Sequence, residues 1–338
     1  MSQFSRIRLL SVAVVCFVVA GVATGLAFAR GNAARIGNGV VVINTNLGYQ
    51  DGAAAGTGMV LSSSGEILTN NHVIRGATTI KVVLPGTGRT YTAKVVGYSV
   101  SNDVAVLQAQ NASNLKTIAL ADSSKLSVGQ SVTALGNAGG TGRLLSAAGR
   151  ITGLNKAITA SDEGSSPERL TGLIETDAGI QPGDSGGPLL NSAGRAIGMD
   201  TAASTSSPYA SASATDAYAI PINKALTLAR QIESGTSSST VHIGGTAFLG
   251  IQVDPGSGDA PASGALIAAV IANGPAASAG LAAGDVITAI NGRTVATPTA
   301  ITSILLTKTP GAKVTVTYLD QFGTSTTTTV TLGSGPAQ

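Results

Sequence analysis

The chain has 338 residues, of which 43% are hydrophobic and only 11% are charged, with a formal net charge of +3. At about 100–200 residues per domain this length predicts two domains plus further segments, and the scattered basic residues argue against nucleic-acid binding. A single cysteine, Cys16, excludes an intramolecular disulfide, and one cysteine with two histidines excludes a Cys/His zinc site.

The N-terminal segment, residues 1–33, is predicted to be a signal peptide or a transmembrane anchor. No charge occurs from Leu9 to Ala29, and Arg6 and Arg8 precede this apolar stretch. Its length favours an anchor, which needs about 20 apolar residues. Ala27-Phe28-Ala29 instead fits a cleavage site. In both cases the positive N-terminus predicts that the rest of the chain is extracytoplasmic, either on the cell membrane or secreted.

Short β-branched runs separated by Gly, Ser and Asn follow, and they predict an all-β barrel or sandwich. Examples are Val40–Ile43, Ile80–Leu84 and Val104–Leu107. A helix is expected at Ile222–Ile232, where apolar residues recur at helical spacing. We assign residues 38–232 to this first domain.

A Gly/Ser/Thr run after Glu233 has nothing to bury, which predicts a linker over residues 233–243. The remaining unit, residues 244–334, is predicted to be a small α/β domain. Its expected strands lie near 248–253, 265–271, 286–290, 313–318 and 326–331, with a helix near 297–306.

The strongest chemical signal is the hexapeptide Gly183-Asp184-Ser185-Gly186-Gly187-Pro188. A serine hydroxyl is a poor nucleophile unless a base takes its proton and a carboxylate orients that base. Amide donors must also face the developing oxyanion. Gly183 and Ser185, with Asp184 between them, are the expected oxyanion-hole residues, and Ser185 is the expected nucleophile.

The base follows by elimination, because the chain has only His72 and His242 and the latter lies beyond the first domain. The acid is less certain from the residues alone. Asp103 stands at the start of a buried strand, where a carboxylate is well placed to hold a histidine. Asp51, Asp122 and Asp177 compete with it on composition.

At this point the motifs resemble those of HtrA/DegP-type serine proteases, most closely the actinobacterial secreted HtrA-like proteases with one PDZ domain. The resemblance covers about residues 38–333. Three stretches carry the His, Asp and Ser of the family in that order: Leu68–Val73, Asn102–Val106 and Thr176–Gly187. Two later stretches fit as well: Gly198–Ala203 and Tyr218–Ile222.

The resemblance implies a chymotrypsin-like domain of two six-stranded β-barrels with the triad between them. It selects Asp103 as the acid, beside His72 and Ser185. It also suggests that Ile180 and Ala203 line the S1 pocket, which implies cleavage after small or medium aliphatic residues.

The C-terminal unit is similar to a PDZ domain. Phe248-Leu249-Gly250-Ile251 looks like a carboxylate-binding loop followed by a strand edge, and Gly284–Gly292 resembles the PDZ signature. Such a groove would bind hydrophobic C-terminal peptides by adding a strand.

The sequence therefore predicts an exported serine endopeptidase that hydrolyses unfolded or misfolded extracytoplasmic proteins, with no metal and no organic cofactor. The alternative is a holdase-like or PDZ scaffold protein with weak or latent proteolysis. The resemblance also suggests assembly into a homotrimer. However, the segment Arg30–Gly39, before the first strand, has no aromatic residue for trimer contacts.

Overall fold

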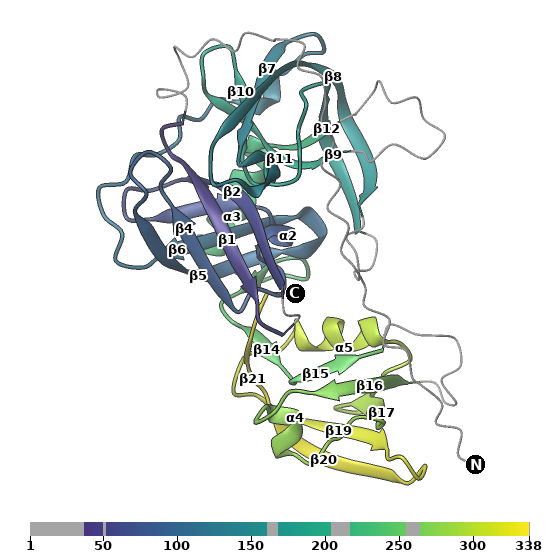
Figure 1. The fold of residues 1–338 in the computed structure, drawn as a ribbon. Coiled ribbons are helices and arrows are strands. Elements are labelled where there is room, and N and C mark those ends of the chain that lie inside the picture. The colour runs from purple at the N-terminus through teal and green to yellow at the C-terminus, as the bar shows by residue number, and fades with distance from the viewer. Residues whose placement is uncertain (1–36, 50–51, 161–167, 204–216, 255–263, 338) are drawn as a thin grey trace, which may run out of the picture. The chain divides into compact units, whose positions relative to one another are not determined.

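The computed structural model describes residues 37–49, 52–160, 168–203, 217–254 and 264–337 (Figure 1). The predicted leader, residues 1–33, lies outside these ranges. Within them, no helix combines the length and the apolar character that crossing a membrane requires.

The first barrel is a ring of six antiparallel strands closed by pairing of β5 with β6. Alternating burial along β4 shows one face in the barrel interior and one in solvent, as the pleat of a strand requires. The strands are β1 (Val40–Leu47), β2 (Gly52–Val60), β3 (Glu66–Thr69), β4 (Thr79–Val83), β5 (Thr90–Ser99) and β6 (Val104–Ala109).

The second barrel is also closed and has the strand order β10-β11-β12-β9-β8-β7. Two long strands, β8 and β9, form its largest hairpin. The strands are β7 (Ser131–Gly136), β8 (Leu145–Ala160), β9 (Glu168–Thr176), β10 (Pro188–Asn191), β11 (Ala196–Ala203) and β12 (Ala217–Pro221).

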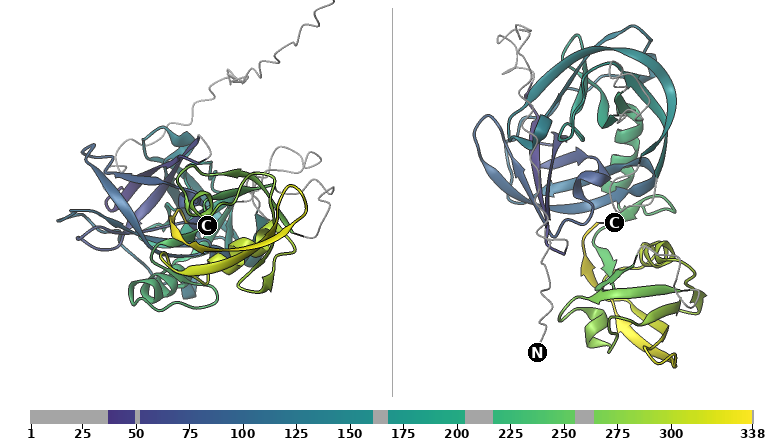
Figure 2. Two further views of the ribbon diagram at one scale, coloured as in Figure 1. Left: turned by 90° about the horizontal axis from the view of Figure 1, so that it is seen from below. Right: turned by 45° about the vertical axis from the view of Figure 1, so that its right-hand side comes forward.

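One hydrophobic core joins the two barrels. It contains Val104 and Met59 from the first barrel and Leu135 and Met199 from the second. The helix α3 (Ile222–Glu233) packs on β5 and β6 as well as on β11 and β12, and the right-hand view of Figure 2 shows it in green beside both barrels. Side chains at the facing ends of the barrels are thereby held in fixed positions.

The predicted linker leads back to the first barrel. After α3, β13 (His242–Ile243) pairs antiparallel with β5 at Gly97 and Tyr98. The linker therefore ends as an added strand on the first sheet.

The C-terminal unit has a main sheet in the order β15-β16-β17-β19-β20, with β18 on β17, and a separate pair of β14 and β21. Its own core includes Ile267, Ile290 and Val316. The elements are β14 (Thr246–Phe248), β15 (Ile251–Val253), β16 (Ala265–Val270), α4 (Pro275–Ser278), β17 (Val286–Ile290), β18 (Arg293–Thr294), α5 (Pro298–Leu305), β19 (Lys313–Leu319), β20 (Ser325–Thr331) and β21 (Gly333–Gly335).

The fold class is the predicted one: mostly β, with two six-stranded barrels followed by a small α/β unit. Short helical turns connect the strands. These turns are α2 (Asn71–Ile74), η1 (Val100–Asn102), η2 (Ser123–Lys125) and η3 (Ala138–Gly140). One of them, α2, carries the predicted site residue His72, and Asp103 directly follows another, η1.

Candidate active site

The turn that carries Ser185 depends on two glycines with positive φ, Gly183 (+100°) and Gly186 (+84°). A β-carbon on Gly186 would lie 2.1 Å from the carbonyl oxygen of Thr57 and 2.3 Å from Oγ1 of Thr69. Both neighbours belong to the first barrel, and the Thr57 amide donates to the Ser185 carbonyl at 2.8 Å. The turn is thus clamped against the opposite barrel, and only glycine fits there.

The imidazole of His72 is oriented by a carboxylate. His72 lies on α2, and its Nδ1 is 2.9 Å from Oδ2 of Asp103. The backbone N–H of His72 donates to the other carboxylate oxygen, Oδ1, at 3.0 Å. Because a carboxylate only accepts hydrogen bonds, Nδ1 carries a proton in this contact. Neutral His72 then presents its lone pair at Nε2, as a general base requires.

Asp103 adopts a conformation that is costly for a residue with a side chain. It ends η1 with φ 51° and ψ 48°, in the left-handed region. The Asn70 side-chain amide donates to its carbonyl at 2.8 Å, and the Asp103 side chain is only 4% exposed. Strain of this kind persists where the surroundings hold it, commonly at functional sites.

The competing carboxylates that the structure describes are bonded elsewhere. Asp122 caps η2 and accepts from Asn223, and Asp177 accepts the backbone N–H of Arg150. Asp51 lies outside the described residues. Of the candidate acids within the described ranges, the structure therefore brings only Asp103 to the histidine.

Thr201 connects the acid to the nucleophile. Its hydroxyl donates to Oδ2 of Asp103, and its carbonyl accepts from Oγ of Ser185 at 3.4 Å. Together with the His72–Asp103 contact, these bonds link all three predicted triad residues. Sequence reasoning missed this role, because a threonine within a strand carries no signal of its own; the only hint was its place in the Gly198–Ala203 stretch.

The backbone amides of the turn differ in their availability. Among the described residues, neither the Gly183 nor the Ser185 N–H donates to an acceptor, whereas the Asp184 N–H donates to the Gln181 carbonyl at 2.9 Å. The predicted oxyanion set therefore needs correction for Asp184. Its amide is already used within the turn, so only the amides of Gly183 and Ser185 are open to an oxyanion.

The predicted S1 residues are less informative. Ile180 is 6% exposed and packs in the core of the second barrel with Leu189 and Ile197. Ala203 ends β11 and pairs with Ala217, and its side chain is not described. The S1 assignment stays a prediction.

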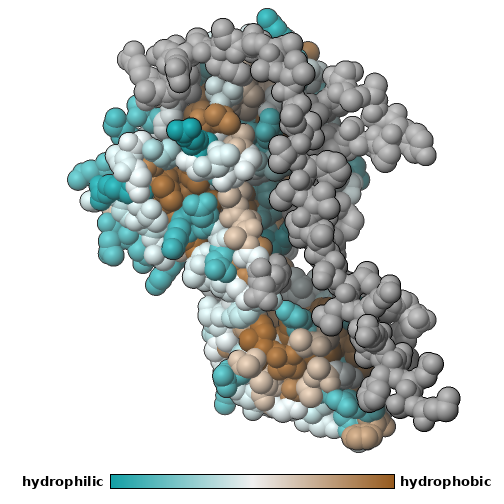
Figure 3. All heavy atoms as spheres, in the orientation of Figure 1, coloured by the Kyte–Doolittle hydropathy of each residue, from teal (hydrophilic) through white to brown (hydrophobic). Residues whose placement is uncertain are grey.

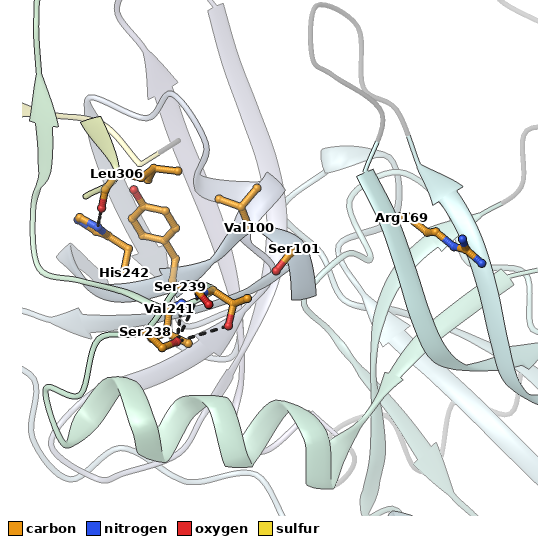
Figure 4. A pocket seen from close by; sticks show the side chains of 10 residues that line it. Val100, Ser101, Arg169, Ser238, Ser239, Val241, His242 and Leu306 are labelled. Atoms are coloured by element: carbon orange, nitrogen blue, oxygen red, sulfur yellow. Dashed lines mark hydrogen bonds between the residues drawn. The ribbon is translucent and has the colours of Figure 1, made fainter. Parts of the chain in front are cut away.

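The second histidine and a pocket that it lines lie away from this centre. His242 stacks at a tilt on Tyr98, and each ring nitrogen lies 3.1 Å from a carbonyl oxygen, of Leu306 and of Gly245. The pocket in Figure 4 is lined by this histidine, neighbouring linker residues and Arg169, but by no triad residue. Arg169 stands apart from the other labelled side chains, so its charge is not directed at them.

The predicted peptide-binding loop has one buried and one partly exposed apolar side chain. Leu249 is in the core, while Phe248 stacks on Tyr49 with ring centroids 5.2 Å apart. Gly250 has φ +80°, and Ile251 opens β15 opposite Val270.

In the part of the chain that the structure describes, the amides of Leu249 and Gly250 donate to no acceptor. Brown, hydrophobic spheres gather over β14, β15 and α5 in Figure 3. An apolar surface next to open amides suits a peptide terminus.

Comparison with known protein families assigns both units. Residues 56–199 match the trypsin-like peptidase domain, and residues 247–331 match the PDZ domain. These two matches cover the first domain's triad and the whole predicted peptide loop.

Individual proteins are similar over most of the chain. Serine protease PepD of Mycobacterium tuberculosis is 36% identical over 313 residues, covering 89% of this chain and 65% of that protein. The periplasmic pH-dependent serine endoprotease DegQ of Escherichia coli is 38% identical over 273 residues, covering 77% and 55%. The solved structure of the HtrA-type protease AlgW with tripeptide is 28% identical, covers 90% of this chain and 96% of that one, and has a TM-score of 0.50. The chain spans between about half and just under two thirds of the length of these curated relatives.

Proposed function

Because the chain belongs to the HtrA/DegP-type trypsin-like serine proteases with one PDZ domain, we propose that it is a serine endopeptidase acting on unfolded or misfolded extracytoplasmic polypeptides. The observation that carries the proposal is the bonded series from Ser185 through Thr201 and Asp103 to His72. A nucleophile, its base and the carboxylate that orients the base are the groups that acyl transfer needs.

In the first step, Oγ of Ser185 attacks the carbonyl carbon of the scissile peptide bond while His72 Nε2 takes the hydroxyl proton. The imidazolium that forms is stabilised by Asp103 through Nδ1. The carbonyl oxygen becomes an oxyanion and accepts hydrogen bonds from the amides of Gly183 and Ser185, the two that have no other acceptor.

When the tetrahedral intermediate collapses, the C–N bond breaks and His72 donates its proton to the leaving amine nitrogen. Water then attacks the acyl-enzyme, with His72 as base, and releases the carboxylic acid product and free Ser185. Each step moves one proton through one residue, so no metal or organic cofactor enters the scheme.

The PDZ domain is the proposed recruiting site. The open amides of Leu249 and Gly250 would bind a terminal carboxylate, and the edge of β15 would pair with the peptide backbone. The apolar surface over β14, β15 and α5 favours hydrophobic C-terminal residues. Substrate cleavage after small aliphatic residues, through Ile180 and Ala203, is part of the same proposal.

The names of the relatives, which include periplasmic enzymes, support an extracytoplasmic location. Anchoring or export by residues 1–33 and assembly into a homotrimer remain proposals. No specific observation favours the holdase or scaffold alternative over proteolysis.

The deciding experiment is casein hydrolysis by the purified chain beside its Ser185→Ala variant. We expect the parent to cleave casein and the variant to be inactive while keeping the same thermal unfolding temperature. Cleavage by both proteins would exclude Ser185 as the nucleophile. If neither protein cleaves casein even after hydrophobic C-terminal peptides are added, the protease proposal fails.

A further inference from the structure

Two carboxyl groups lie directly behind the nucleophile turn, and the mechanism uses neither. Asp184 immediately precedes Ser185 and is 4% exposed, and Asp200 immediately precedes Thr201 and is 0% exposed. Gly136 lies against the first of them: a β-carbon there would be 2.5 Å from Oδ1 of Asp184. The chain is therefore tightly packed around Asp184, and the Asp200 side chain is closed off from solvent.

Most of the oxygens of this pair have no donor. Oδ2 of Asp184 accepts the backbone N–H of Gln181 at 2.9 Å. Among the described residues, Oδ1 of Asp184 and both carboxyl oxygens of Asp200 have no hydrogen-bond partner of good geometry. A buried carboxylate that lacks donors is strongly unfavourable, because it only accepts hydrogen bonds and has lost its water.

The two groups also repel each other when both are ionised. Burial raises the pKa of Asp200 well above its usual value, and the negative charge of Asp184 raises it further. Burial also raises the pKa of Asp184, although the amides of Gln181 and Ala138 oppose this rise. Asp200 is therefore the carboxyl that retains a proton, because it is fully buried and neither of its oxygens has a donor among the described residues.

No cation offsets this pair within the structure as described. The elements packed on β11 are β10, β12 and α3, and β10 has no ionisable side chain. The ionisable side chains of the other two are those of Tyr218, Lys224, Arg230 and Glu233. Lys224 donates to the Thr171 carbonyl, Arg230 and Glu233 are exposed, and Asp184 is the one charged group that acts on Asp200.

The backbone ties Asp200 to the catalytic turn on both sides. Its N–H donates to the Gly187 carbonyl at 2.8 Å, and its carbonyl accepts from the Gly186 N–H at 2.8 Å. The next residue, Thr201, contacts both Asp103 and Ser185. A displacement of Asp200 would therefore reach the nucleophile and the acid together.

We propose that Asp200 is a positioning residue that keeps its proton at neutral pH and so stays an uncharged carboxylic acid. Asp184 and Asp200 together then hold a single negative charge at the Ser185 turn. Loss of the Asp200 proton at alkaline pH places a second charge there, which repels Asp184 and misaligns the amides of Gly183 and Ser185. This consequence for activity rests on the proposed protease function; the retained proton does not.

The proton itself is tested by infrared spectroscopy of the full chain with Ser185→Ala, which prevents self-digestion. At neutral pH we expect the C=O stretching band of a protonated carboxylic acid, lost when Asp200→Asn is added and lost in the parent as pH rises. The difference spectrum between parent and variant separates this band from that of other protonated carboxyls. Asp122→Asn is the matched control, because the pKa of Asp122 is lowered to about 2 by the Ser124 amide and it carries no proton.

The positioning role is tested by the pH profile of kcat/KM in the active enzyme. Asn at position 200 is uncharged and has no proton to lose, so Asp200→Asn should extend activity to alkaline pH. Above the apparent pKa of the pair we expect the parent's kcat/KM to fall about tenfold per pH unit relative to the variant.

Two results would overturn the proposal. Either no band distinguishes parent from Asp200→Asn at neutral pH, or the band is present and the two pH profiles superimpose. An inactive parent would refute the protease proposal instead, and the infrared result would still decide whether Asp200 holds a proton.

Discussion

Thr201→Val replaces the hydroxyl that bonds Asp103 with a methyl group of nearly the same size. The side chain is buried, with 4% exposure, so no water replaces the lost donor. Asp103 keeps its contacts with the ring and the backbone N–H of His72. The substitution therefore removes one hydrogen bond from the triad and leaves the histidine in place.

A hydrogen bond to a charged group contributes about 1.5–3 kcal/mol. The negative charge of Asp103 matters most when His72 is an imidazolium, in the transition state. If the whole loss is felt there, kcat/KM falls by about 10–150-fold, since about 1.4 kcal/mol corresponds to a factor of ten. We expect the fall mainly in kcat, because Thr201 offers only its backbone carbonyl to Ser185.

The assay is steady-state cleavage of a fluorogenic peptide by the parent, Thr201→Val and Thr201→Ser. Serine keeps the hydroxyl and should restore most of the rate. Thermal unfolding of all three proteins separates a catalytic effect from a loss of fold. If Thr201→Val keeps kcat/KM within about twofold of the parent, the link between Thr201 and Asp103 has no catalytic role and the reasoning is refuted.

Two further predictions concern stability. Gly186→Ala forces a β-carbon against Thr57 and Thr69 at φ +84°, so it should lower the free energy of unfolding by about 2–5 kcal/mol, from backbone strain and overpacking together. The control is Gly194→Ala, where φ is +69° but no atom lies within 4 Å of the added carbon. In thermal denaturation Gly186→Ala should lose more stability than Gly194→Ala, and equal losses would contradict the steric argument. Burial raises the pKa of Glu66 from 4.5 to about 7, and the charge of Glu233 adds to this rise. Between these two values the folded state binds more protons than the unfolded state, so the stability that protonated Glu66 contributes is lost as pH rises through about 7. Relative to Glu66→Gln, the parent should lose unfolding temperature over that window, and parallel curves would show that the carboxyl proton is not involved.

The local motifs allowed much of the site to be predicted. Gly183–Pro188 identifies a nucleophile turn because a serine between glycines at that spacing supplies both the hydroxyl and its amide donors. His72 follows because the first domain has no other imidazole. The strand and turn pattern likewise predicts an all-β barrel or sandwich, since alternation and breakers are local properties of the chain. The division into two barrels is implied by the family resemblance.

The residues that only the tertiary structure identifies act through contacts that are distant in sequence. Thr201 reaches Asp103 across 98 positions, and nothing local marks it as a partner. The amide of Asp184 is excluded from the oxyanion set by a bond to Gln181 that depends on the shape of the turn. The shared burial of Asp184 and Asp200 arises only when β11 closes behind the nucleophile turn.

The sequence by itself therefore determined the chemistry, because nucleophile, base and turn are set by residue type and short-range spacing. The closure of the two barrels decided which carboxylate contacts the histidine and which carboxyls are buried without a donor. That choice depends on burial and on the donors within reach, and both are properties of the packed interface between the barrels.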